Sequence, residues 1–311
     1  MSAIQEDRTN NPLEDEIDLK ELIVALWKGK VTIISVTTLF ALSSIYISLS
    51  LTNIYTSESL LFSRDLDNKG SLSQLSGLAS MAGFGSIEGQ SDSFKVIEII
   101  KSREFVKHLL TFEDVLPSLI APMSYDKSTK KLSFDPEIYN ETTKSWVREI
   151  SDNTPAIPTY LEAHRAYSEN LSVTQDKKTQ FINIKFEHIS PVFAQEFLTI
   201  IIREANNLNR EFDIEMSNKA LNYLSTELSR TTLLEIKNSI SELIQAQLET
   251  KMMASIYDEY SLVTLEPPFI PDRKSSPIRS LIVIFSTLVG GLLSVFYVLV
   301  RHYTVDKKEQ S

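Results

Sequence analysis

The side chains that most often carry out catalysis are few in this chain and lie far apart. Its four histidines are scattered, and none has a partner at metal-ligand or triad spacing: His108, His164, His188 and His302. Cysteine is absent, which removes thiolate metal sites and disulfide frameworks. A GxxxxGK[ST] loop is also missing, which excludes a built-in ATPase or tyrosine kinase. The sequence therefore predicts no catalytic residue, no metal site and no cofactor.

The carboxylates are abundant, but most stand beside Lys or Arg on predicted helix faces, where solvated charge is the ordinary interpretation. A hydrolase that trims glycans would need a pair of carboxylates in a perturbed environment, and sequence cannot reveal such a pair. Aromatic residues from Tyr139 to Tyr167, including Trp146 and Tyr160, either stack on sugar rings or pack in a core. The formal net charge of −10 disfavours nucleic acid as a partner.

Two apolar runs near the ends of the chain predict membrane-spanning helices. Residues 31–51 and 278–300 each contain about 20 largely uncharged residues, enough for an α-helix to cross a hydrocarbon core. A cleaved signal peptide is the alternative for the first run, but its leader is 30 residues long and acidic. Basic residues flank the outer ends of both runs and place both tails in the cytoplasm: Lys20, Lys28, Lys30, Arg301, Lys307 and Lys308.

This topology divides the chain into five parts. A cytoplasmic tail, residues 1–30, contains a short amphipathic helix from Asp18 to Trp27 that can lie on the membrane surface. The first span, 31–51, leads to a periplasmic domain, 52–277, and the second span, 278–300, leads to a cytoplasmic tail, 301–311. The tails are too short to hold a kinase, a transmitter or a nucleotide-binding fold, so the domain between the spans is the functional body.

The predicted strands and helices of that domain indicate an α+β fold. Strands are predicted at 54–62, 171–173, 181–186 and 261–265, and helix at 91–110, with loops and short helices around Trp146 across 111–158. The glycine- and serine-rich stretch 70–90 carries apolar residues at every third position, which indicates a loop that docks, for example on a neighbouring subunit.

A long helical stretch dominates the second half of the domain. Ser190 and Pro191 form a preferred helix start, and no proline or glycine follows until Pro267. Apolar residues recur at helical spacing over about 191–254, with a break predicted near 229–232, so we expect two long antiparallel helices. Such a hairpin exposes apolar surface and favours oligomerisation. A compact helical bundle is the alternative.

Two motifs precede and enter the second span. The connector 266–277 is rich in proline, which fixes an extended, semi-rigid backbone: Pro267, Pro268, Pro271, Ser276 and Pro277. Small residues then share one face of the span, where another helix could approach closely: Ser286, Gly290 and Ser294, with Gly291 beside them. Simple packing against lipid is the other interpretation of this face.

In the same order along nearly the whole chain, these motifs resemble those of the Wzz-type chain-length determinants, the polysaccharide co-polymerases of bacterial inner membranes. The matching segments are IDLKELIVALWKGK (17–30), IYTSESLLF (54–62), LSGLASMAGFG (75–85), FINIKFEHISPVFAQEF (181–197), MMA (252–254), LEPPFIP (265–271) and SSPIRSLIVIFSTLVGG (275–291).

The resemblance implies a non-catalytic protein with a membrane-proximal α/β base, a long extended helical hairpin, two transmembrane helices and assembly into a homo-oligomeric ring. Its implied partners are a separate O-antigen polymerase in the membrane, the growing lipid-linked glycan and the lipid bilayer. By carry-over, the proline motif and the two glycines belong to the region tied to chain-length control and to contact with polymerase: Pro267, Pro268, Pro271, Ser276, Pro277, Gly290 and Gly291.

The function expected from this resemblance is control of the modal length of lipopolysaccharide O-antigen. The glycine-rich loop is shared with capsule-type co-polymerases, so a role for capsule, exopolysaccharide or common antigen is the closest alternative. A two-span periplasmic sensor is an alternative of another class, although it would need an output module that the 11 residues from Arg301 do not provide.

Overall fold

A computed structural model describes residues 19–64, 92–149 and 155–309. The chain divides into two compact units, one formed by Met1–Leu51 with Pro277–Ser311 and the other by Thr52–Ser276. We describe each unit separately and call them the helical unit and the α+β unit. The predicted loop at 70–90 lies outside the described residues.

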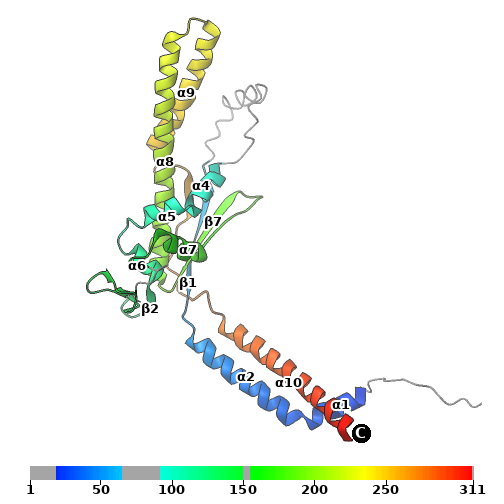
Figure 1. Cartoon of the computed structure of the whole chain (residues 1–311). Helices are drawn as coiled ribbons and strands as arrows, with labels where there is room; N and C mark the ends of the chain where they lie inside the picture. Colours follow the sequence, from blue (N-terminus) through cyan, green and yellow to red (C-terminus); the bar gives the residue numbers. More distant parts are fainter. Residues whose placement is uncertain (1–18, 65–91, 150–154, 310–311) are drawn as a thin grey trace, which may run out of the picture. The chain divides into compact units, whose positions relative to one another are not determined.

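The helical unit consists of α1 (Leu19–Lys28), α2 (Lys30–Ser50) and α10 (Arg279–Glu309). α2 and α10 lie side by side (Figure 1), and residues 30–50 and 279–302 are long and apolar enough to cross a membrane. α1 packs on α10 and buries Ala25. Gly29 separates α1 from α2, and a Cβ there would collide with Val298, so only glycine allows this close packing.

The α+β unit is built on a four-stranded antiparallel sheet in the order β6-β7-β1-β8. Its strands confirm the four predicted ones: β1 (Tyr55–Ser63), β6 (Leu171–Gln175), β7 (Phe181–His188) and β8 (Leu262–Glu266). Burial alternates along β1 and β7, as expected for a sheet with one covered face. The β6–β7 turn forms because Asp176 Oδ1 accepts hydrogen bonds from the backbone N–H groups of Lys178 and Thr179.

Helices cover the buried face of this sheet. The first half of α8 (Pro191–Arg230) packs on β1 and β7, where Phe186, Phe197 and Ile201 are fully buried. α4 (Asp92–Lys101), α5 (Arg103–Leu109), α6 (Val115–Ile120) and α7 (Tyr160–Asn170) complete the core. The helix predicted at 91–110 is present as two helices, because the chain breaks at Ser102, whose Oγ caps α5 by accepting from the Phe105 N–H at 3.1 Å.

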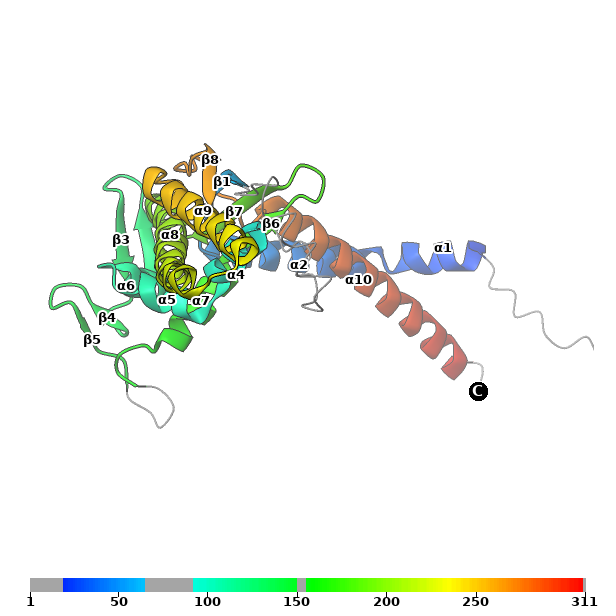
Figure 2. The same cartoon turned by 90° about the horizontal axis from the view of Figure 1, so that it is seen from above.

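The long helical hairpin is present. Ser190 caps α8 by accepting from the Phe193 N–H, and Pro191 is its first residue, as predicted. α8 ends at Arg230 and α9 (Leu234–Ile256) returns alongside it, so the break lies at 231–233, close to the predicted position. At 1.5 Å per residue, the 40 residues of α8 extend about 60 Å. α8 runs well past the sheet (Figure 1), and the view from above (Figure 2) shows α9 beside it, which excludes a compact bundle.

The segment 111–158 differs from the prediction, because Trp146 lies in a strand and not beside short helices. Two small hairpins form here: β2 (Pro122–Asp126) with β3 (Lys131–Phe134), and β4 (Tyr139–Asn140) with β5 (Ser145–Trp146). The second turn closes because Asn140 Oδ1 accepts from the N–H groups of Thr142 and Thr143, both at 3.0 Å. The Tyr139 and Trp146 rings then pack with centroids 5.0 Å apart, which favours packing over exposed stacking for these two aromatics.

Candidate functional site

The proline connector continues directly from β8 and is held against β1 by two buried serines. Ser59 Oγ donates to the Glu266 carbonyl at 2.7 Å, and Ser57 Oγ donates to the Phe269 carbonyl at 2.8 Å. Both serines occupy the inward-facing positions of β1, where an apolar residue would be ordinary. Their hydroxyls fix the path of a segment in which proline cannot donate from its backbone.

The far end of the connector is fixed in the same way. The Ile54 N–H donates to the Ser276 carbonyl at 2.9 Å, and the Ser275 N–H donates back to the Ile54 carbonyl at 2.9 Å. Ser275 Oγ also donates to that carbonyl at 3.0 Å. The connector is therefore bonded at both ends to β1 and the residues that lead into it, which makes residues 266–276 a defined strap.

The predicted proline residues do not share one environment. Pro271 is buried, Pro268 and Pro277 are half-buried, and Pro267 is exposed. Between them, Phe269 is 49% exposed and Ile270 is 50% exposed. Sequence reasoning singled out the prolines and missed these two apolar side chains, which the strap presents to solvent and which suit a partner contact.

In the helical unit, the predicted small residues of α10 face α2 at Gly290. A Cβ added to Gly290 would lie 2.6 Å from Phe40 Cβ, whereas one added to Gly291 would meet only Thr37 Oγ1, at 4.0 Å. Ser294 is buried and donates from its Oγ to the Gly291 carbonyl at 2.7 Å. Ser286 lines a hollow of about 390 Å³ with Phe40. Gly290 thus sets how closely the two helices of one chain approach.

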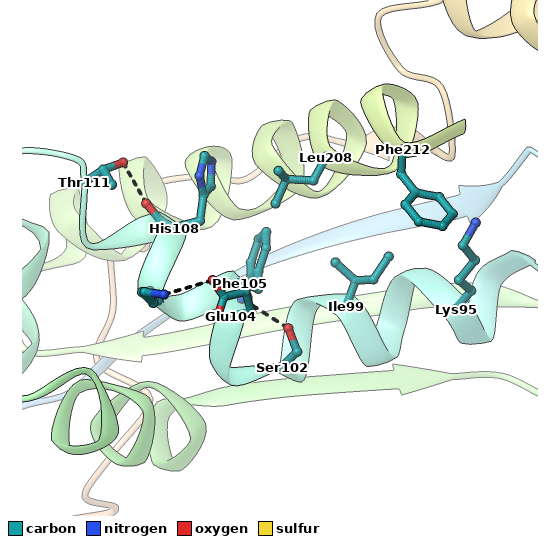
Figure 3. A pocket seen from close by; sticks show the side chains of 10 residues that line it. Lys95, Ile99, Ser102, Glu104, Phe105, His108, Thr111, Leu208 and Phe212 are labelled. Atoms are coloured by element: carbon teal, nitrogen blue, oxygen red, sulfur yellow. Dashed lines mark hydrogen bonds and ion pairs between the residues drawn. The ribbon is translucent and has the colours of Figure 1, made fainter. Parts of the chain in front are cut away.

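An apolar groove lies on the α+β unit where α4 and α5 face α8. Figure 3 shows Ile99 and Phe105 directed toward Leu208 and Phe212 across this space, whose volume is about 680 Å³. Phe212 is 47% exposed, and the Lys95 ammonium lies 4.9 Å from its ring centroid. The groove therefore has an apolar surface beside the Lys95 ammonium, and this surface is suited to binding another apolar segment.

One buried carboxylate is an exception to the expectation that most acidic groups are solvated. Glu204 is only 8% exposed; His108 Nε2 lies 2.9 Å from its Oε2, and Arg203 Nε donates to its Oε1 at 2.9 Å. Burial raises the pKa of Glu204, but the hydrogen bonds from His108 and Arg203 outweigh it and hold the pKa below its usual value. The pair joins residues 96 positions apart, so no local spacing could reveal it.

The other described histidines of the α+β unit make backbone contacts. The His164 ring lies 3.0 Å from the Lys101 carbonyl. His188, the last residue of β7, is buried: its Nδ1 accepts from the Ser190 N–H, so its Nε2–H donates to the Ser118 carbonyl. Burial lowers the pKa of His188 to about 4. Within the described ranges, no three His, Asp or Glu side chains gather as a metal site would require.

The comparison with protein families agrees with the resemblance found in the sequence. Residues 15–111 match the family model described as Wzz, chain length determinant protein. A solved "full-length bacterial polysaccharide co-polymerase" is similar over 94% of this chain and 99% of its own length, with 14% sequence identity and a TM-score of 0.40. A "Fragment of WzzB, Polysaccharide Co-polymerase from Salmonella Typhimurium" is similar over 72% of this chain and all of the fragment, with 12% identity and a TM-score of 0.29. The comparison with curated proteins gives no match.

Proposed function

We propose that this protein sets the modal length of lipopolysaccharide O-antigen made by a separate membrane polymerase, because residues 15–111 match the family model of the Wzz chain length determinant protein. The family match is the observation that carries the proposal. Wzz family members are co-polymerase regulators rather than catalysts, in agreement with a protein that acts through shape and assembly. Two apolar helices near the ends of the chain support membrane anchoring.

The proposed location is the bacterial inner membrane, with both tails in the cytoplasm and the α+β unit in the periplasm. The absence of cysteine makes this testable with single thiols. Ser241→Cys, at an exposed position of α9, should react with a membrane-impermeant maleimide added to spheroplasts, while Ser2→Cys should react only after lysis. Protection of Ser241→Cys in intact spheroplasts would contradict the orientation.

The proposed assembly is a homo-oligomeric ring, and the apolar groove supports it as a subunit contact. Phe212, at the edge of this groove, is half-exposed to solvent in a single chain. A neighbouring copy of the chain can cover this apolar surface. Phe212→Asp should shift the purified protein in mild detergent toward smaller species, measured by light scattering. Met123→Asp places the same charge at an exposed residue of β2 outside the groove and should leave the size unchanged. Equal behaviour of the two variants would remove the groove from the contact.

The proposed glycan is O-antigen, and the test is the length distribution of lipopolysaccharide after deletion of the gene. Loss of a clustered ladder, restored by the intact gene, is the expected result. An unchanged ladder together with an altered capsule, exopolysaccharide or common antigen would transfer the same regulatory role to that polymer. A sensor would alter gene expression without acting on the length of any glycan.

The proposed functional motif is the strap with the glycines of α10, as implied by the family resemblance. Its residues are Pro267, Pro268, Pro271, Ser276, Pro277, Gly290 and Gly291. The exposed Phe269 and Ile270 add an apolar contact for the polymerase. Replacing both with Ser should broaden the glycan ladder while the protein level is maintained, whereas Met123→Ser removes a comparably exposed apolar residue elsewhere and should not.

A further inference from the structure

A second hollow, on the helical unit, has a chemistry that length control does not use. Its volume is about 350 Å³, and it lies where the turn between α1 and α2 meets α10. It is lined by Lys28, the last residue of α1, and by Thr32 of α2. Three residues of α10 also line it: Tyr297, Arg301 and His302. Two of these five side chains, Lys28 and Arg301, are permanent cations.

The two permanent cations of this hollow, Lys28 and Arg301, make no ion pair with any residue that the structure describes. Both side chains are exposed. Lys30 lies nearby in sequence with its ammonium 5.0 Å from the centroid of the Trp27 ring. Cations held together in this way in a chain of net charge −10 favour an anionic ligand.

The position of the hollow along the apolar spans indicates which anion. The span of α2 begins at Lys30 and the span of α10 ends at His302, so the hollow lies at the same end of both spans. In a bilayer that end is at the level of the lipid headgroups, where Lys and Arg meet phosphate.

The neighbouring helix α1 provides the apolar part of a lipid site. Its Ala25 is buried, whereas Ile23, Val24 and Trp27 share another face and are 56%, 50% and 68% exposed. Side chains of this kind enter the boundary between headgroups and acyl chains. Cations at the hollow and apolar side chains beside it match the two ends of a phospholipid.

We propose that this hollow binds the headgroup phosphate of an anionic phospholipid, held by Lys28 and Arg301 with the acyl chains against α1. The proposal shares with the proposed function only membrane anchoring, and it does not depend on any glycan. Its failure would therefore leave length control untouched, and an unchanged glycan ladder would leave the lipid site untouched.

The test uses the full chain in mild detergent and native mass spectrometry with phosphatidylglycerol or phosphatidylcholine of identical acyl chains. The wild type should retain phosphatidylglycerol preferentially. Lys28→Gln with Arg301→Gln should weaken that retention about 30-fold, at roughly fivefold per lost cation. The matched control, Arg103→Gln with Arg165→Gln, removes two exposed charges from the α+β unit and should retain the lipid as the wild type does.

Four results would overturn the proposal. Equal retention of the two lipids would show that charge does not select the ligand. Unchanged retention in the Lys28 and Arg301 variant would place the lipid elsewhere, and displacement by excess inorganic phosphate alone would indicate a site for free phosphate. If a chain without residues 1–16 retains more phosphatidylglycerol than the full chain, the hollow would instead be a binding site for the chain's own acidic tail.

Discussion

Adding one methyl group should destabilise the helical unit more at Gly290 than at Gly291. The two residues are adjacent in α10, so Gly→Ala makes the same chemical change in the same helix. At Gly290 the new Cβ would lie 2.6 Å from Phe40 Cβ and 2.7 Å from Phe40 Cγ. Both atoms are close to the Phe40 backbone, and no change of rotamer can move the Cβ away. At Gly291 it would meet only Thr37 Oγ1, at 4.0 Å, which is ordinary contact.

The size of the difference follows from this geometry. Ordinary van der Waals contact begins at 3.4 Å, so Gly290→Ala requires α2 and α10 to separate locally by about 0.8 Å. Overpacking of this kind costs about 1–3 kcal/mol. The gain in helix propensity from Gly to Ala, about 1 kcal/mol, is common to both variants and cancels in their comparison. Gly290→Ala should therefore be less stable than Gly291→Ala by about 1–3 kcal/mol.

Tryptophan fluorescence can measure this in the helical unit alone. The chain has two tryptophans, and Trp146→Phe leaves only Trp27, in the helix that packs on α10. In that background, titration with a denaturing detergent should give a lower midpoint for Gly290→Ala than for Gly291→Ala. Equal midpoints, or a higher one for Gly290→Ala, would refute the close approach of the two helices at Gly290.

Two further predictions concern the α+β unit, each checked by denaturant unfolding of the full chain in mild detergent. Asn206→Ala should lower the free energy of unfolding by about 3 kcal/mol, because the buried Asn206 amide accepts from the N–H of Leu262 (2.8 Å) and donates to its carbonyl (2.9 Å). The control Asn207→Ala loses only side-chain contacts and should lower it by less than about 1 kcal/mol. Equal losses in the two variants would contradict a stabilising role for the Asn206 bonds to Leu262. Because the pKa of His188 falls from 6.5 to about 4 on folding, the unfolded chain binds its proton first, so stability should decline by up to about 3 kcal/mol as pH falls from 6.5 to 4. His188→Gln should flatten that decline, whereas His164→Gln, at a half-buried position, should not. Identical pH profiles would contradict a buried neutral imidazole.

The elements that sequence predicted are those whose pattern is local and long. The helical hairpin follows from the proline- and glycine-free run after Pro191 and its apolar periodicity, and Ser190 marks its start. The pair β6 and β7 follows from one-sided alternation around a turn at Asp176. Each of these patterns contains enough residues to distinguish a helix from a strand.

The features that sequence missed depend on contacts between distant residues or on a few turn residues. β4 and β5 have two residues each, too few for a periodic pattern, and the Asn140 side chain that closes their turn resembles any other polar loop residue. Ser57 and Ser59 interrupt the apolar alternation of β1 because they bind a strap more than 200 positions later. The prolines of that strap were visible in sequence, but the exposure of Phe269 and Ile270 between them was not.

The most direct test of the central claim is the glycan of a deletion strain, measured both as chain-length distribution and as total repeat units. A regulator without a catalytic centre should change the distribution from clustered to broad while the total remains close to that of the parent strain, and the intact gene should restore the cluster. Loss of the polymer itself, or a distribution that does not change for any surface glycan, would contradict the account.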